Sequence, residues 1–182
     1  MVVCSLVHCR SVPSKLFETS DTPMTPMEIR FAADGMLQSL GTWLRLLGYD
    51  CIGDRDHWGR ALLEQAVTEN RVFLTRNAHL NANLPHDLLT RANIVFVLAE
   101  HLPDQIREVT GKFGLDKERF TFTRCLACNV PLLSTADMSC VPSDVAARET
   151  ECWHCPACGK TFWRGSHVHN SLTRLQKWLE SA

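Results

Sequence analysis

Four cysteines of this chain occur as two C-x-x-C pairs, Cys125–Cys128 and Cys155–Cys158. A turn of this spacing presents two sulfurs to one ion, and two such pairs supply the four thiolates of a tetrahedral zinc site. Gly159 follows the second pair, where glycine permits the positive φ that such a turn uses. Because a closed four-thiolate shell leaves no position for water, the pattern predicts a structural zinc ion and not a catalytic one.

Two other interpretations of these cysteines stay open. The four thiols could be buried or redox-active cysteines without a metal. Cys152 also offers a competing register, Cys152-x-x-Cys155-x-x-Cys158, and His154 is a further candidate ligand. We prefer the two-pair set because it fills four coordination positions with no ligand left over.

A second group of candidate ligands carries oxygen. Asp34, Asp54 and Asp56, and Asn77 each follow a short apolar run of the type that forms strands. If these strands are parallel, their carboxyl ends meet at one edge of the sheet, where ligands of α/β proteins bind. Oxygen ligands suit Mg²⁺ or Mn²⁺, and such an ion can activate water against a phosphodiester. In the alternative interpretation, Asp34 is a helix N-cap and the other two carboxylates are solvated loop residues.

The elements that must position these side chains alternate between strand and helix. Apolar residues recur at helical spacing from Met36 to Leu47, and Gly48 is a plausible end of that helix. Another helix is expected to begin near Pro103. Strands are expected at residues 29–33, 49–52, 71–75 and 94–98, the last being a pure apolar run typical of buried parallel strands. The alternation predicts an α/β fold with a parallel sheet flanked by helices.

The chain divides into four expected regions. Residues 1–26 contain three prolines and no periodicity, so we expect a disordered extension there. Residues 27–120 carry the strand–helix alternation, and residues 121–170 are rich in cysteine and aromatic residues and form the expected zinc ribbon. Residues 171–182 form a last helix, with Leu172, Leu175, Trp178 and Leu179 on one side.

Composition narrows the function further. The 182 residues are 45% hydrophobic and 21% charged, which is typical of a soluble globular protein, and no apolar stretch is long enough to span a membrane. The net charge is −1 and there is no strongly basic arm, so any nucleic-acid binding must use a local patch. Nine cysteines, an odd count with two C-x-x-C pairs, favour a reducing compartment, and we expect the cytoplasm.

Several segments, taken in order, resemble the Mut7-C RNase domain family, which has a PIN-like nuclease fold followed by a zinc ribbon. The matching segments are Phe31-Ala-Ala-Asp34-Gly-Met-Leu, Trp43-Leu-Arg45-Leu-Leu-Gly48-Tyr-Asp50, Arg71-Val-Phe-Leu-Thr75-Arg76, Arg124-Cys125-Leu-Ala-Cys128-Asn129, Cys155-Pro-Ala-Cys158-Gly-Lys and Trp163-Arg-Gly165-Ser166-His167. Together they cover most of the chain from residue 27 to residue 169.

The resemblance implies a ribonuclease that uses Mg²⁺ or Mn²⁺ to cleave single-stranded RNA. Asp34 would be the first acidic ligand, and Asp56 is our choice for the second over Asp54 and Glu64. The family's central strand typically ends Leu-Thr-Arg-Asp, whereas this chain has Asn77 at the last position. An amide can coordinate Mg²⁺ but brings no charge, so the alternative is a noncatalytic RNA-binding or adaptor protein on the same fold.

Supporting residues for RNA binding lie in both parts of the chain. Arg76 and Arg124 are candidate phosphate contacts, because a guanidinium offers a bidentate fork. His167 is a candidate substrate-binding residue, and Trp163 beside it could stack on a base. In the alternative interpretation, the arginines are ordinary surface residues and Trp163 packs against the nuclease domain.

Overall fold

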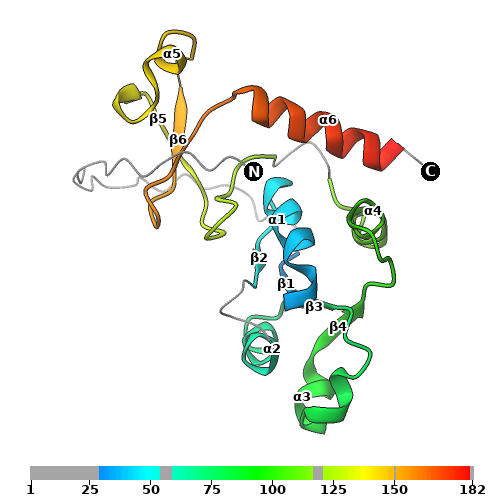
Figure 1. Ribbon diagram of the computed structural model, residues 1–182. Helices are drawn as coiled ribbons and strands as arrows, with labels where there is room; N and C mark the ends of the chain where they lie inside the picture. Colours follow the sequence, from blue (N-terminus) through cyan, green and yellow to red (C-terminus); the bar gives the residue numbers. More distant parts are fainter. Residues whose placement is uncertain (1–28, 54–58, 117–120, 150, 181–182) are drawn as a thin grey trace, which may run out of the picture.

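The computed structural model describes residues 29–53, 59–116, 121–149 and 151–180 (Figure 1). The extension expected at residues 1–26 lies outside these ranges. Four parallel strands form the central sheet in the order β2-β1-β3-β4, which confirms the predicted α/β class. Their bounds are β1 Phe31–Ala33, β2 Cys51–Ile52, β3 Val72–Thr75 and β4 Asn93–Phe96.

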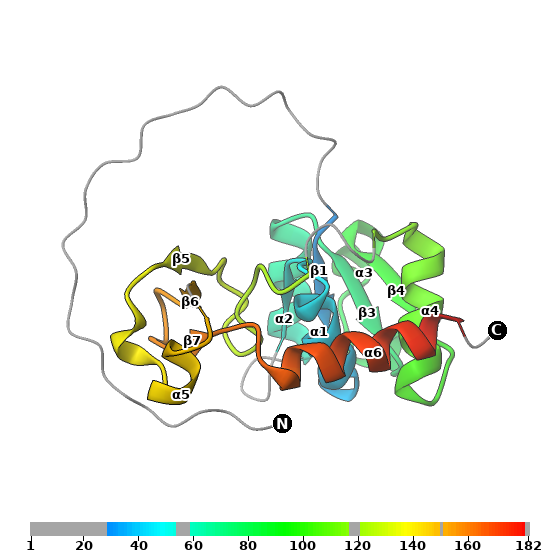
Figure 2. The ribbon, with the colours of Figure 1, turned by 90° about the horizontal axis from the view of Figure 1, so that it is seen from above.

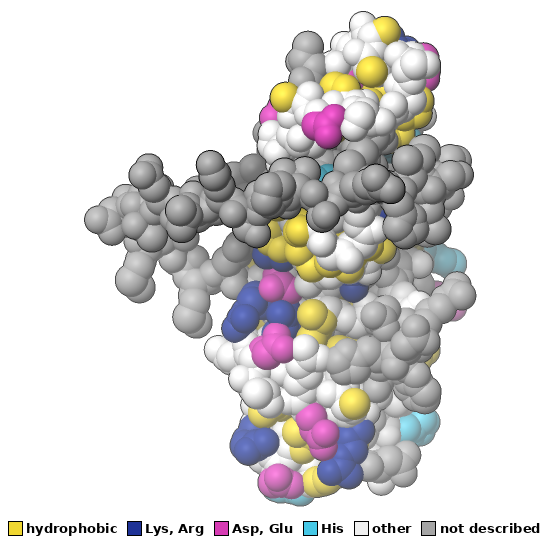
Figure 3. All heavy atoms as spheres, turned by 90° about the vertical axis from the view of Figure 1, so that its left-hand side faces the viewer, with side chains coloured by type: hydrophobic (Ala, Val, Ile, Leu, Met, Phe, Trp, Pro, Cys, Tyr) yellow, Lys and Arg dark blue, Asp and Glu magenta, His cyan; other side chains and the backbone are white. Residues whose placement is uncertain are grey.

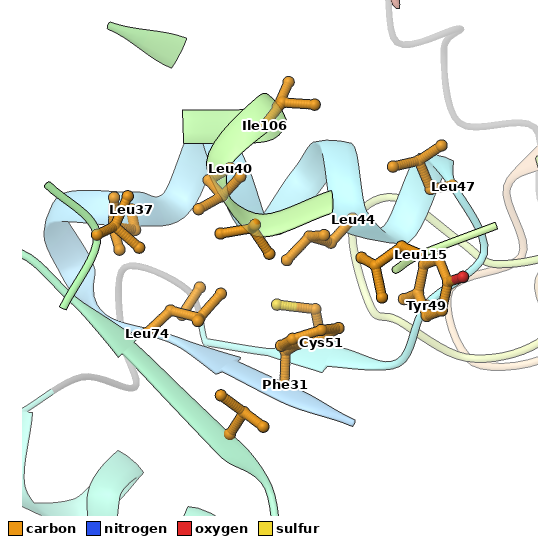
Figure 4. Close-up of a cluster of buried hydrophobic side chains, with 14 of the residues drawn as sticks. Phe31, Leu37, Leu40, Leu44, Leu47, Tyr49, Cys51, Leu74, Ile106 and Leu115 are labelled. Atoms are coloured by element: carbon orange, nitrogen blue, oxygen red, sulfur yellow. The ribbon is translucent and has the colours of Figure 1, made fainter. Parts of the chain in front are cut away.

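Helices cover both faces of this sheet. Side chains alternate along β1 and β3, so Phe31 and Leu74 face one layer while Ala32 and Phe73 face the other. The first face packs against α1, which follows a 3-10 helix η1, and against α4 (Figure 4). The second face packs against α2 and α3. The bounds are η1 Gly35–Leu37, α1 Gln38–Leu46, α2 Gly59–Thr68, a 3-10 helix η2 Leu80–Asn83, α3 His86–Arg91 and α4 Leu102–Phe113.

One strand differs from its prediction. The apolar run at residues 94–98 was expected to be buried, but β4 lies at the edge of the sheet, and Phe96 and Leu98 are 42% and 83% exposed. Val97 is buried against the α1 and α4 layer. An apolar run shows that a segment can be buried, but the order of strands decides whether a neighbour covers it.

The C-terminal part forms a second, antiparallel sheet. Its strands follow the order β5-β6-β7, with bounds β5 Leu133–Thr135, β6 Cys152–His154 and β7 Thr161–Phe162. A 3-10 helix η3 Met138–Cys140 and helix α5 Ser143–Ala146 lie in the long connection between β5 and β6. We call this sheet, its connections and the two C-x-x-C turns the ribbon module (Figure 2).

Helix α6, Ser166–Glu180, returns from the ribbon module to the α/β domain. It begins at Ser166, earlier than the expected boundary at residue 171. Leu175 is buried in the core that α1 and α4 share, and the Trp178 ring lies 4.7 Å from the Trp43 ring, centroid to centroid. None of the helices in the described ranges is long and apolar enough to cross a bilayer.

A buried arginine joins the ribbon module to the α/β domain. Arg45, on the last turn of α1, is 6% exposed and its guanidinium donates four hydrogen bonds to backbone carbonyls. Two go to the β2 segment, at Cys51 and Gly53, each at 2.7 Å. The other two go to the first C-x-x-C turn, at Leu126 and Ala127, each at 3.0 Å. One side chain thereby satisfies acceptors from two separate parts of the chain.

A polar network beside Arg45 strengthens this junction. The Asn129 amide donates to the Asp50 carboxylate at 2.7 Å and accepts from the Cys51 backbone N–H at 3.1 Å. Arg71 binds the same carboxylate through both terminal nitrogens, with the shorter bond at 2.6 Å. Although burial alone raises the pKa of Asp50, the bonds from Arg71 and Asn129 outweigh it and hold that pKa below its ordinary value.

Replacing the buried arginine tests whether it holds the junction. Arg45→Met keeps much of the apolar stem but leaves four carbonyls without their donor, and each buried acceptor left unpaired costs about 1–3 kcal/mol. We expect the free energy of unfolding in urea to fall by at least about 3 kcal/mol. The matched control, Arg60→Met on α2, removes an exposed ion pair with Glu64 and is expected to change it by less than about 0.5 kcal/mol. Equal effects of the two variants would contradict the assignment.

The depressed pKa of Asp50 gives a pH-dependent prediction. A carboxylate whose pKa is lowered by folding stabilises the native state above its ordinary pKa of about 3.9, and this contribution is lost as pH falls through the folded-state value. Asp50→Asn should therefore lower the melting temperature near neutral pH, and the gap to the native protein should narrow as the pH falls below about 4. A gap that is constant across the pH range would show that Asp50 carries no linked proton.

Candidate functional site

The order of strands places Asp34 at the point where the chain reverses direction across the sheet. From β1 the chain goes through α1 to β2 on one side, then crosses through α2 to β3 on the other. In open α/β sheets a crevice forms at the carboxyl ends of the two strands that flank such a reversal. Asp34 follows β1 directly, and its backbone N–H donates to the Leu74 carbonyl of β3 at 2.9 Å.

Hydrogen bonds fix the Asp34 carboxylate on both oxygens. Its Oδ1 accepts from the Gly35 N–H at 2.8 Å, so the side chain does cap η1, as the alternative interpretation expected. Its Oδ2 accepts from the Thr75 hydroxyl, also at 2.8 Å. Thr75 is fully buried, and its hydroxyl oxygen in turn accepts from the Asn77 N–H at 3.0 Å. Asp34 is only 7% exposed, so its orientation is set by the protein and not by solvent.

A cavity of about 430 Å³ opens beside this carboxylate. Its described lining contains one carboxylate, that of Asp34, and one other side chain predicted as a ligand, that of Asn77. The remaining lining residues are Gly35, Met36, Gln38, Gly59 and Leu80. Residues 54–58 lie outside the described ranges, so the predicted ligand Asp56 and its alternative Asp54 have no described position. Gly59, the first described residue after residues 54–58, lines the cavity.

Asn77 has a local structural role at the rim of the cavity. Its amide Oδ1 accepts from the His79 N–H at 3.0 Å, which is the hydrogen bond of an Asx turn. An aspartate at this position can make the same bond, so the turn itself does not require an amide. A carbonyl oxygen has two lone pairs, and one therefore stays available for a ligand.

The predicted RNA-binding residues do not gather around the Asp34 cavity. Arg76 donates to the Glu100 carbonyl at 3.1 Å and lies near the carboxyl ends of β3 and β4. The Arg124 guanidinium bonds to the carbonyls of Gly48 and Asn129, at 3.1 and 2.9 Å, so its described contacts belong to the domain junction. His167 is exposed at the start of α6, with its ring edge-on to the ring of Trp163.

The four predicted cysteines converge at one point of the ribbon module. Their sulfur atoms all lie within 4.8 Å of one another, with Sγ–Sγ distances of 3.3 Å from Cys125 to Cys128, 3.4 Å from Cys128 to Cys155 and 3.8 Å from Cys125 to Cys158. Sulfurs about 2.3 Å from a central zinc are about 3.8 Å apart in a tetrahedron. The set therefore has the donor atoms and spacing to hold one metal ion such as zinc.

The two C-x-x-C turns have the same backbone design. Asn129 and Gly159, the residues after each pair, have φ of 64° and 68°, and each N–H donates to the carbonyl of the first cysteine of its pair at 2.9 Å. The N–H of each first cysteine also donates across its turn, from Cys125 to Val130 and from Cys155 to Lys160, both at 2.9 Å. Asparagine is one of the few residue types besides glycine that adopt a positive φ readily, so Asn129 can occupy in the first turn the position that Gly159 occupies in the second.

The neighbouring cysteines and histidine fall outside this cluster. Cys152 is buried in β6, and its thiol contacts the backbone carbonyls of Thr135 and Asp137. Within the described ranges, the set of Cys125, Cys128, Cys155 and Cys158 is the single group of three or more potential ligands placed closely enough for one ion, so it includes neither Cys152 nor His154. Burial raises the pKa of the Cys51 thiol to about 12, which keeps it protonated at neutral pH.

The roles of three residues on which these sites depend were not predicted from the sequence. Thr75 orients Asp34, while Arg45 and Asn129 dock the first C-x-x-C turn. A signal for Thr75 was available, because a β-branched hydroxyl residue ends the apolar run of β3 beside a predicted ligand. No local pattern indicates that an arginine on α1 reaches a turn about 80 residues later in the chain.

The cysteine cluster leads to a metal prediction. We expect about one zinc ion per purified chain, and Cys158→Ser should remove it and unfold the ribbon module, because a structural zinc supplies much of the folding energy of a small module. Elemental analysis and limited proteolysis measure the two effects. Cys152→Ser is the matched control, expected to keep the zinc because Cys152 lies outside the cluster. A ribbon module that resists proteolysis without any bound metal would refute this assignment.

Comparison with known proteins gives one finding. A family model, that of the Mut7-C RNAse domain, matches residues 29–175, which span the α/β domain, the ribbon module and most of α6. Searches of curated proteins and of solved structures give no match. The family model indicates a nuclease-type function, in agreement with the resemblance carried by the sequence motifs. Because the match covers most of its length, this chain belongs to the Mut7-C RNase domain family.

Proposed function

We propose that this protein is a divalent-metal-dependent endoribonuclease that cleaves single-stranded RNA at the Asp34 cavity. The observation that carries the proposal is the buried Asp34 carboxylate, held by Thr75 at the strand reversal and open to a cavity of about 430 Å³. The match to an RNase domain family supports RNA as the substrate. A carboxylate oriented on both oxygens loses little freedom when it receives a ligand.

The residues around the cavity fit a hard cation. Asp34 would hold Mg²⁺ or Mn²⁺ together with Asp56 as the second acid, and the Asn77 amide oxygen would be a neutral third ligand. A bound ion of this kind lowers the pKa of water and neutralises charge that develops on a phosphate. Thr75 acts through Asp34, because its hydroxyl fixes the rotation of the carboxylate. Arg76, near the same edge of the sheet, is the proposed phosphate contact.

A second candidate function has an observation in its favour. Asn77 stands where the family pattern has an aspartate, so it brings no charge to the cavity. Among the described lining residues, Asp34 is then the single negative charge. A site with one charge binds Mg²⁺ weakly, so the same fold could serve as a noncatalytic RNA-binding or adaptor protein.

Replacing Asp34 distinguishes the two functions. Asp34→Asn should abolish cleavage of a mixed-sequence single-stranded RNA, while the melting temperature stays close to that of the native protein. The fold is preserved because asparagine caps a helix nearly as well as aspartate, and its oxygen can still accept from the Gly35 N–H. Gel assays with added Mg²⁺ or Mn²⁺, against a chelator control, measure the rate, and zinc content is checked after chelation. The control variant Asp144→Asn changes an exposed carboxylate on α5, away from the Asp34 cavity, and should keep the native rate.

Replacing Asn77 by aspartate should raise the rate of RNA cleavage. Asn77→Asp adds a charge to the cavity and keeps the acceptor for the His79 N–H, so we expect tighter Mg²⁺ binding and at least a tenfold lower Mg²⁺ requirement, about 1.4 kcal/mol. Isothermal titration of Mg²⁺ measures the affinity independently of cleavage. The adaptor function predicts RNA binding that does not depend on Asp34 and no cleavage in any variant. Cleavage that survives both chelation and Asp34→Asn would refute the proposed mechanism.

A further inference from the structure

A groove separate from the Asp34 cavity lies between the ribbon module and the first turns of α6. Its volume is about 690 Å³, within the range of roughly 300–1,000 Å³ that is usual for ligand pockets. One wall is the linker that enters the ribbon module, another is the sheet at β6 and β7, and the third is the first turns of α6. The lining residues that matter for binding are Phe122, Trp153, Phe162, Trp163, Arg164 and His169.

The lining combines aromatic rings with positive charge. The side chains of Trp153, Phe162 and Trp163 are half-buried, so ring surface remains accessible to a ligand. The Arg164 guanidinium lies 5.6 Å from the centre of the Trp153 ring, within the range of a cation–π contact. His169 adds an exposed imidazole, and no carboxylate is among the described lining residues. A groove of this composition disfavours cationic ligands and suits a flat ring attached to an anion.

Gly165 allows the rings at the rim to approach the backbone. A Cβ at this position would lie 2.8 Å from the indole nitrogen of Trp163 and 3.1 Å from the His167 ring. Trp163, Arg164 and Gly165 line both this groove and a second hollow of about 370 Å³. The second hollow is also lined by Asp144, Arg148 and Glu149, so its charge is mixed. The face of the molecule drawn in Figure 3 also shows acidic and basic side chains interspersed where atoms are described. The groove is distinguished from these surfaces by its lack of acids among the described lining residues.

We propose that this groove binds bases of single-stranded RNA by stacking on Trp153 and its neighbours, with Arg164 contacting the backbone phosphate. The inference deepens the proposed function and rests on it for the identity of the ligand. Aromatic stacking accepts any base, because every base has a flat π surface, so the groove gives affinity without sequence preference. Unpaired bases are required, since a base in a duplex cannot reach the ring.

The position of the groove sets a minimum substrate length. Asp34 lies at the start of η1, whereas Phe122, which lines the groove, donates its N–H to Leu46 at the end of α1. At about 1.5 Å per residue, the helical segment between them spans about 18 Å. A stacked strand rises about 3.4 Å per nucleotide, so an RNA that reaches both sites needs more than about five nucleotides. Shorter RNA can occupy the Asp34 cavity alone.

Binding is measured without cleavage by fluorescence anisotropy. A labelled oligouridylate of about 16 nucleotides is titrated with the full chain carrying Asp34→Asn, which serves as the parent for the groove variants. Arg164→Ala should weaken binding at least about tenfold and reduce the salt slope by about 0.7. Trp153→Leu, which keeps apolar bulk but loses the flat ring, should weaken it similarly, and Trp153→Phe should restore much of the affinity. Arg148→Ala, an arginine of the same module in the acid-lined hollow, is the matched control and should bind as tightly as the parent. Melting temperature and zinc content show whether each variant is folded.

The outcomes separate this inference from the proposed function. In the active chain, Arg164→Ala should raise the KM for the longer RNA and leave kcat unchanged, and RNA of about four nucleotides should be cleaved as by the native protein. If RNA is cleaved but Arg164→Ala and Trp153→Leu bind it normally, the groove inference is overturned and the proposed function stands. If the groove variants weaken binding but no variant cleaves, the groove stands and the proposed function fails. A loss of binding in Arg148→Ala equal to that in Arg164→Ala would also overturn the inference.

Discussion

The arrangement of this protein depends on one buried guanidinium. Arg45 sits among backbone carbonyls of β2 and of the first C-x-x-C turn, and its four hydrogen bonds go to those carbonyls. A buried charge is costly to desolvate, and hydrogen bonds to the charged group offset this cost. The five donors of a guanidinium point in fixed directions, so the acceptors must come to it. Neither the β2 segment nor the cysteine turn can move away without leaving that charge unsatisfied.

Because Arg45 docks the ribbon module, the cysteine cluster and Asp34 lie at opposite ends of the η1–α1 helical segment. The ribbon module docks at the end of α1, where Gly48 and Asp50 lead into β2, while Asp34 lies at the start of the helical segment on the opposite edge of the sheet. Arg45 also binds the carbonyl of Gly53, the last described residue before the segment that carries Asp54 and Asp56.

The fold and the sites could be predicted to different degrees. The parallel sheet was correctly predicted, because strands that alternate with amphipathic helices along the chain form a parallel sheet whose two faces the helices cover. The exposure of β4 was not predicted, since the same apolar run is compatible with a central strand and with an edge strand. Helix α6 begins at Ser166, ahead of the apolar periodicity that starts at Leu172, because its first turn is mostly polar and carries no pattern that a sequence could reveal. Asp34 and Asn77 lie together as parallel strands require, whereas Arg124 and His167 lie elsewhere.

By itself the sequence determined the local features, which depend on residues that are close in the chain. These are the helix end at Gly48, the two C-x-x-C turns with Asn129 and Gly159 after them, the strand–helix alternation and the family resemblance. Tertiary structure alone decided which distant groups meet. It brings the Thr75 hydroxyl to the Asp34 carboxylate and the Arg45 guanidinium to the first C-x-x-C turn. It also places Trp153 and Arg164 together beside the start of α6. The physical reason is that backbone preferences act over a few residues, whereas a buried polar group is satisfied by any partner that the packing of the whole chain brings within about 3 Å.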